Sequence, residues 1–210
     1  ALHSFCHADG GWHLMGCILS AASCNSWWVN GILQSDDYKK EEAGLDECLG
    51  KNDVYFLPYL MGERSPHNDV TARGAFIGMR PDTTRGQMTL AMLDGVTFAL
   101  RDCMEAAKKN GACIPRTKLC GGGAKSRLWR KIVANVMNMP VDIPQTEQGP
   151  RFGAAMLAMV GCGEYASVQE AASAIVRVKE TVLPDAKIAA DYEARYRHFT
   201  KLYPALKGLF

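Results

Sequence analysis

The feature that most constrains the fold is segment 85–109, where apolar side chains lie on almost every face of a helix. These side chains are Met88, Leu90, Met92, Leu93, Val96, Phe98, Leu100 and Met104. A helix that is apolar around most of its circumference has to be enclosed by other elements. Gly95 in its interior costs about 1 kcal/mol relative to alanine. That cost indicates close packing or the approach of a ligand at this position.

Strand and helix patterns flank this helix on both sides. Before it, a hairpin around the turn 9–11, a helix over 20–33 and short strands over 54–60 and 74–79 are expected. After it, a strand over 118–120, a helix from about 126, a strand over 141–144, a helix from about 150 and a helix over 186–206 follow. The order predicts an α/β fold with a mixed sheet and helices packed on it.

Composition excludes several classes of protein. The 210 residues carry 24 basic and 22 acidic side chains, a net charge of +2, which argues against nucleic acid and anionic membrane as partners. Eight cysteines without a C-x-x-C pair predict reduced thiols and a cytoplasmic location. The apolar stretch 154–160 is too short for a membrane span, and no signal peptide is visible. Because the chain starts without Met inside an expected strand, we interpret it as a fragment.

The sharpest local signal is a run of glycines between a predicted strand and a predicted helix. Residues 121–123 are all glycine, and the helix begins near Ser126. Glycines let backbone N–H groups approach a phosphate or ribose, and a helix N-terminus offers free donors and a positive dipole end. Ala124 before Lys125 excludes a Walker A loop, and Ser126 excludes the dinucleotide fingerprint. The turn therefore predicts either a nucleotide contact or a strand-to-helix turn without ligand.

The hairpin carries His3, His7 and His13 together with Cys6. These positions on a bent hairpin do not define a tetrahedral ligand set. We expect a structural role for the histidines and no metal site in this chain.

Several separated motifs resemble the C-terminal domain of the FGGY family of carbohydrate kinases. The stretch GAFIGM at 74–79, with residues 87–94, is similar to the family signature. The loop FLPYLMGERSPH at 56–67 and the hairpin 3–15 resemble those of xylulose kinases within the family. The glycine turn is also followed by the expected Trp-Arg pair within 121–130. The motifs occur in the right order and the resemblance covers nearly the whole chain.

The resemblance implies a ribonuclease-H-like fold, the fold of actin- and hexokinase-type ATPases, with a mixed sheet flanked by helices. It implies that residues 1–210 form a single domain, the nucleotide side of a two-domain kinase. The sugar site, the phosphate-binding turns and the catalytic Asp of that family lie in an N-terminal domain absent from this chain. We therefore expect no catalytic residue here and no activity from the chain alone.

Carried over residue by residue, the resemblance places Gly122, Gly123 and Ala124 against the nucleotide. Arg127 stands where some relatives have a nucleotide-contacting Asn. Its role stays open between stacking on adenine, reaching a phosphate and pointing to water. Asp94 occupies the position of an acid in the family's buried helix, and a buried carboxylate has to be hydrogen-bonded. We expect a structural role for it.

The implied activity is ATP-dependent, Mg²⁺-requiring phosphorylation of a ketopentose, with D-xylulose converted to D-xylulose 5-phosphate. Two alternatives stay open: another kinase of this family, acting on ribulose, gluconate, rhamnulose or glycerol, or a non-catalytic nucleotide-binding module of the same fold. The expected partners are ATP, the sugar and the missing domain. An apolar face left open by that domain predicts self-association, as a homodimer.

Overall fold

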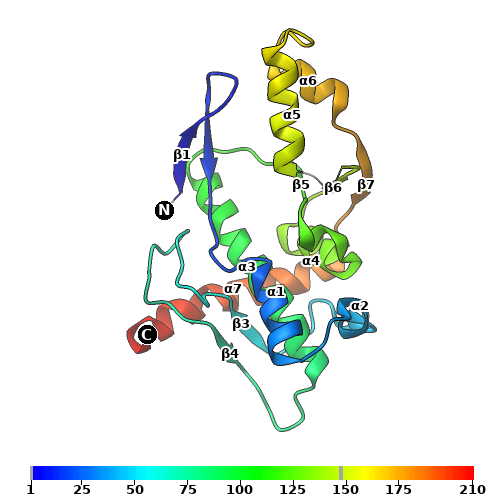
Figure 1. The fold of residues 1–210 in the computed structure, drawn as a ribbon. Helices are drawn as coiled ribbons and strands as arrows, with labels where there is room; N and C mark the ends of the chain where they lie inside the picture. Colours follow the sequence, from blue (N-terminus) through cyan, green and yellow to red (C-terminus); the bar gives the residue numbers. More distant parts are fainter. Residues whose placement is uncertain (1, 147–148) are drawn as a thin grey trace.

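Helix α3, Arg85–Lys109, runs through the middle of the molecule with the other elements around it (Figure 1). The computed structural model describes residues 2–146 and 149–210. Every residue of α3 from Thr89 to Ala99 is buried, which confirms the expectation of an enclosed helix. A capping box fixes its start, because Thr84 Oγ1 accepts from Gln87 N at 3.2 Å and Gln87 Oε1 accepts from Thr84 N at 2.8 Å.

The elements before α3 begin with an antiparallel hairpin of β1, His3–Cys6, and β2, Trp12–Met15. Helix α1, Ser23–Ser26, continues into a π-helical turn over Trp27–Ile32. Helix α2 follows at Tyr38–Glu42, with a 3₁₀ turn at Leu45–Cys48. The hairpin is confirmed, and the helix expected over 20–33 is present as this α1 and π pair.

Strands β3, Tyr55–Leu57, and β4, Ala75–Ile77, form a separate antiparallel pair that packs against α3. This contact explains Gly95. A Cβ built there would lie 2.1 Å from the carbonyl oxygen of Phe56. Of the two reasons that the sequence left open for this glycine, close packing is therefore the one observed.

The elements after α3 form a three-stranded mixed sheet with helices around it. Strand β5, Thr117–Lys118, is parallel to β6, Val141–Pro144, and β6 is antiparallel to β7, Val178–Val182. The helices are α4, Arg127–Met137; α5, Gly149–Gly161; α6, Val168–Ile175; and α7, Ala186–Leu206. The predicted α/β class with a mixed sheet is confirmed, whereas α6 and β7 were not predicted.

The hairpin and the α5–α6 pair rise from the same end of the molecule (Figure 1). Their tips are joined, since Gln169 Nε2 donates to Asp9 Oδ2 at 2.8 Å. Both side chains are exposed. A single exposed hydrogen bond contributes little, about 1 kcal/mol or less, to stability. The hairpin and the α5–α6 pair are therefore stabilised mainly by contacts within each of them.

Two tryptophans from neighbouring helical segments bond to threonines buried on α3. Trp28 Nε1 donates to Thr89 Oγ1 at 2.9 Å, and Trp129 Nε1 donates to Thr97 Oγ1 at 2.9 Å. Each bond satisfies a polar group inside an apolar core, where an unpaired indole N–H would be costly. The two bonds therefore fix the rotation of the first helical segment and of α4 about α3.

Asp94 is the acidic side chain that α3 buries at its centre. Its Oδ1 accepts from Tyr192 Oη at 2.9 Å, and its Oδ2 accepts from Arg195 Nη1. Arg195 Nη2 also donates to the Val54 carbonyl at 3.0 Å. The structural role expected for Asp94 is confirmed. The aromatic side chains of α7 that lie in the core are Tyr192, Tyr196, Phe199 and Tyr203.

We expect the change Gly95→Ala to lower the free energy of unfolding by about 1–3 kcal/mol, because the added methyl group forces β3 away from α3. Gly153 in α5 is the matched control, since a Cβ there meets no atom within 4 Å. Its change to Ala should be neutral or stabilise by up to about 1 kcal/mol. Denaturant unfolding measures both, and unaltered stability of Gly95→Ala would contradict the close contact.

Candidate functional site

The glycine turn joins β5 to α4 through a 3₁₀ turn, Gly122–Lys125. Gly121 has a positive φ of +85°, which favours glycine over other residues. Ser126 caps α4 by accepting from Trp129 N at 2.9 Å. Neither Gly122 nor Gly123 has a positive φ.

The two remaining glycines of the turn differ in their surroundings. A Cβ at Gly122 would meet no atom within 4 Å, whereas one at Gly123 would lie 3.1 Å from the indole ring of Trp129. Gly123 is therefore a packing position on α4. Gly122 leaves open space above the backbone.

That space belongs to a cavity of about 400 Å³ over the turn. Three segments form it: the start of the first helix, helix α2 and the turn itself. The lining residues are Ala22, Asn25, Ser26, Tyr38, Lys39, Glu42, Gly122, Gly123, Lys125, Ser126 and Trp129. A concave site of small and aromatic side chains with a few polar groups is typical of small-molecule binding.

The structure brings Gly122 and Gly123 together in this cavity and places the other predicted site residues elsewhere. Ala124 is buried and lines a different, small hollow with Cys120 and Lys179. Arg127 is exposed and lines a different hollow, on the face that carries Asp46. Contact of Ala124 or Arg127 with a ligand in the cavity over the turn does not follow from these positions.

Sequence reasoning missed the residues that the first helical segment and α2 contribute. Asn25 and Ser26 lie almost a hundred residues before the turn, and Tyr38 and Glu42 lie about eighty residues before it. No local motif marks them.

Polar contacts tie α2 to the start of α4. Ser126 Oγ donates to Glu42 Oε2 at 2.6 Å while accepting the Trp129 amide. Burial raises the pKa of Glu42, and the negative charge of Asp46 adds to this, while the bond from Ser126 opposes it. The cavity thus contains a carboxyl group in a partly dehydrated position, next to the N-terminus of α4.

The loop before β4 buries an acidic side chain, Glu63. Its Oε1 accepts from the backbone N–H groups of Arg64 at 2.7 Å and Ser65 at 3.2 Å. The Arg64 guanidinium instead donates to His3 Nε2 at 2.9 Å. The side chains of Glu63 and Arg64 therefore bind different partners. Burial raises the pKa of Glu63 to about 7, although these N–H groups oppose the shift.

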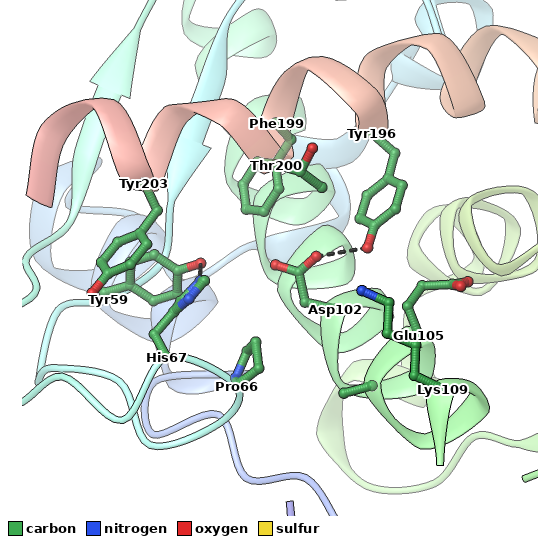
Figure 2. Close-up of a pocket in the computed structure, with 11 residues that line it drawn as sticks. Tyr59, Pro66, His67, Asp102, Glu105, Lys109, Tyr196, Phe199, Thr200 and Tyr203 are labelled. Carbon is green, nitrogen blue, oxygen red and sulfur yellow. Dashed lines mark hydrogen bonds between the residues drawn. The ribbon is translucent and has the colours of Figure 1, made fainter. Parts of the chain in front are cut away.

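Figure 2 shows a second cavity, of about 220 Å³, between α3, α7 and the loop that carries His67. Asp102 accepts from Tyr196 Oη at 2.6 Å, and burial raises the pKa of Asp102 to about 6. His67 stacks on Tyr203, with ring centroids 3.9 Å apart, and shares a hydrogen bond of 3.1 Å with Tyr59 Oη. Among the described residues no side chain lines both this cavity and the cavity over the turn.

Two negative findings hold for residues 2–146 and 149–210. Within them, no three His, Cys, Asp or Glu side chains come close enough to hold a metal ion. None of the helices described there has the length and apolarity that crossing a bilayer requires.

The C-terminal domain of the FGGY family of carbohydrate kinases matches residues 2–162 of this chain. The xylulose kinase of Escherichia coli strain K12 is 36% identical over 100% of the chain, which spans 43% of that relative. The chain thus spans less than half the length of the curated relatives that it matches.

Solved structures of kinases also align with nearly the whole chain. The xyloylose kinase from Brucella ovis aligns with 100% of the chain and 43% of its own length, with a TM-score of 0.90 and 36% identity. The gluconate kinase from Lactobacillus acidophilus aligns with 97% of the chain and 42% of its own length, with a TM-score of 0.84 and 26% identity.

The raised pKa of Glu63 predicts a pH dependence of stability. Its ordinary value is 4.5 and its folded value about 7, so the folded state binds the proton more tightly. The stability from Glu63 is full below pH 4.5 and is lost as the pH rises through 7. When the pH rises from 5 to 8, the free energy of unfolding of Glu63→Gln should therefore increase by about 2 kcal/mol relative to that of the parent chain.

Denaturant unfolding at the two pH values measures this difference. Glu47, an exposed carboxylate, provides the control Glu47→Gln, which should track the parent at both. Burial also raises the pKa of Asp102, so Asp102 contributes a slope of the same sign in all three proteins. If the free energy of unfolding of Glu63→Gln changed with pH by as much as that of the parent, this would contradict a buried, proton-binding carboxyl group at position 63.

Proposed function

Because the chain belongs to the FGGY family of carbohydrate kinases, we propose that it is the nucleotide-binding half of an ATP-dependent sugar kinase. The proposed reaction is phosphorylation of a ketopentose, D-xylulose to D-xylulose 5-phosphate. The observation that carries the proposal is the cavity of about 400 Å³ over the glycine turn. It lies where backbone N–H groups and the start of α4 meet, a geometry suited to phosphate and ribose groups.

The turn and the walls of the cavity have different roles in this proposal. Gly122 lets the nucleotide approach the backbone, because no side chain fills the space above it. The adenosine lies between the first helical segment, with Asn25 and Ser26, and Tyr38 on α2. The polyphosphate leaves the cavity toward the N-terminus of α4, where the positive end of the helix dipole favours negative charge.

The remaining machinery of the kinase has to come from the rest of the protein. Phosphoryl transfer consists mainly of positioning and neutralising charge, with Mg²⁺ bridging the phosphates and a carboxylate accepting the proton of the hydroxyl group. The described residues hold no cluster of three side chains suited to a metal. We therefore assign this half the binding and orientation of ATP, and we assign Mg²⁺ ligation and the base to the other half.

D-xylulose is favoured because the curated relative from Escherichia coli is a xylulose kinase at 36% identity. The gluconate kinase from Lactobacillus acidophilus has almost the same fold over this region, with a TM-score of 0.84. The fold of this half therefore does not by itself separate the two sugars. Gluconate is accordingly the second candidate substrate.

The hairpin supports the proposal of a partner domain. Its exposed fractions are 40% for Phe5, 71% for Trp12 and 48% for Leu14. An isolated two-stranded hairpin is marginally stable in water, and exposed apolar side chains grouped on one element mark an interaction surface. We infer that the remaining part of the kinase covers this hairpin and that the chain alone self-associates through it, as a homodimer.

We expect the change Gly122→Val to raise the Kd for ATP at least tenfold, because the side chain enters the open space over the turn. Folding should be unaffected, since Gly122 has neither a positive φ nor a neighbour within 4 Å of its Cβ position. Calorimetric titration and thermal unfolding of the 210-residue chain measure the two effects. Unchanged ATP affinity in a folded variant would remove the nucleotide from this turn.

The chain alone is expected to show no sugar kinase activity, because no group in it is proposed to deprotonate the sugar hydroxyl. A coupled assay with ATP, Mg²⁺ and D-xylulose, run beside the same assay with D-gluconate, tests this. Sugar phosphate formed by the purified chain above the protein-free background would contradict the assignment of the base to the other half. A complete two-domain relative serves as the positive control.

A further inference from the structure

Asp102 presents a carboxylate oxygen to the cavity between α3, α7 and the loop that carries His67. Its Oδ1 accepts from Tyr196 Oη at 2.6 Å. Its Oδ2 has no hydrogen-bond partner among the described residues and is reachable from the cavity, whereas the unpartnered Oε2 of Glu63 is enclosed by protein atoms. Figure 2 shows Oδ2 turned away from Tyr196, toward the side on which His67 and Tyr203 lie. A ligand in the cavity can therefore reach this oxygen.

The aromatic walls of the cavity have their polar groups paired within the protein. Tyr59 Oη shares a hydrogen bond of 3.1 Å with His67 Nε2, and Tyr203 Oη donates to Asp69 Oδ2 at 2.5 Å. Burial lowers the pKa of His67 to about 4, so its ring is neutral at pH 7. With the ring of Phe199, these side chains offer a ligand mainly uncharged ring surface.

Helix α3 places a positive charge at the same cavity. Asp102, Ala106 and Lys109 follow one another at i, i+4 and i+7, so they share one face of the helix, and all three line the cavity. Lys108 pairs with Glu105 at 3.2 Å, whereas Lys109 has no ion pair among the described residues. Burial raises the pKa of Asp102 to about 6, and the charge of Lys109 is among those that oppose this shift. The cavity thus combines a hydrogen-bond acceptor, a donor and ring faces.

The charges around the cavity decide which class of ligand fits. Aromatic rings and a carboxylate by themselves suit an organic cation. Lys109 on the same face repels a cation, as does Arg101, whose guanidinium lies 4.0 Å from the centroid of the Tyr196 ring. The carboxylate of Asp102 repels an anion. A hydroxyl group is neutral, and it can donate to a carboxylate while it accepts from an ammonium group.

The volume of the cavity limits the size of the ligand. A volume of about 220 Å³ corresponds to about seven water molecules at about 30 Å³ each. Pockets for drug-sized ligands are larger, roughly 300–1,000 Å³. The cavity therefore suits a compound much smaller than a nucleotide.

We propose that this cavity is a second small-molecule site, which binds a neutral polyhydroxy compound of about five carbon atoms. One hydroxyl group of the ligand donates to Asp102 Oδ2 and accepts from Lys109, and its C–H groups pack on the rings of Phe199 and Tyr203. Among the described residues, no side chain lines both this cavity and the one over the glycine turn. The proposal is therefore independent of the nucleotide site proposed above.

The test is a ligand-observed NMR titration of the 210-residue chain with xylitol, a neutral polyol, which should bind saturably. Asp102→Asn should raise the Kd at least tenfold, because the amide oxygen keeps the bond from Tyr196 and the amide N–H group faces the ligand in place of an acceptor. Ala106→Leu fills the cavity and should abolish binding. Asp82→Asn and Ala158→Leu, at exposed positions outside the cavity, are the matched controls and should bind like the parent.

A third variant, Lys109→Met, changes an exposed side chain and should raise the Kd for xylitol about threefold without affecting folding. Absence of saturable xylitol binding would overturn the proposal. So would unchanged binding in Asp102→Asn and Ala106→Leu, with thermal unfolding verifying that both are folded. Tighter binding of ethylammonium or of inorganic phosphate than of xylitol would overturn the assigned class of ligand. ATP should leave the Kd for xylitol unchanged, and displacement of xylitol by ATP would contradict a separate site.

Discussion

The buried ion pair between Asp94 and Arg195 is the interaction on which the rest of the structure depends. It lies at the centre of α3 and joins that helix to α7 and, through the Val54 carbonyl, to the segment entering β3. Neither charge is accessible to water, with side-chain exposures of 1% for Asp94 and 7% for Arg195. Removing either partner would leave the other charge unpaired in the core, which typically costs 3–5 kcal/mol. The pair therefore fixes how α7 lies against α3.

Contacts that begin at α3 also position the cavity over the glycine turn. Thr97 on α3 accepts from the indole of Trp129, and that indole forms the surface against which Gly123 packs. The N-terminus of α4 and the glycine turn are thus positioned by a hydrogen bond in the core. Ser126 extends the connection to α2 through Glu42. The floor and one wall of the proposed nucleotide site are held by a continuous series of contacts that starts at α3.

The parts of the site that could be predicted are those encoded by neighbouring residues. The turn at 121–123 was found because a strand, a glycine run and an amphipathic helix follow one another in the chain. The walls could not be found, because Asn25 and Glu42 reach the turn only through the folding of distant segments onto α3. The resemblance left the role of Arg127 open between adenine, phosphate and water, and the first turn of α4 directs it to a hollow away from the cavity over the turn. Successive residues of a helix point about 100° apart, so a difference of one position decides which face of α4 carries a side chain.

The sequence by itself determined that segment 85–109 is a buried helix, that a helix spans 186–206 and that glycines connect β5 to α4. These follow from periodicity and backbone preference, which act between residues close in the chain. Only the tertiary structure decided that Gly95 faces the carbonyl of Phe56, that the glycine with a positive φ in the turn is Gly121, and that Glu42 accepts from Ser126. Such contacts arise where separate elements pack, and their geometry depends on every side chain between them.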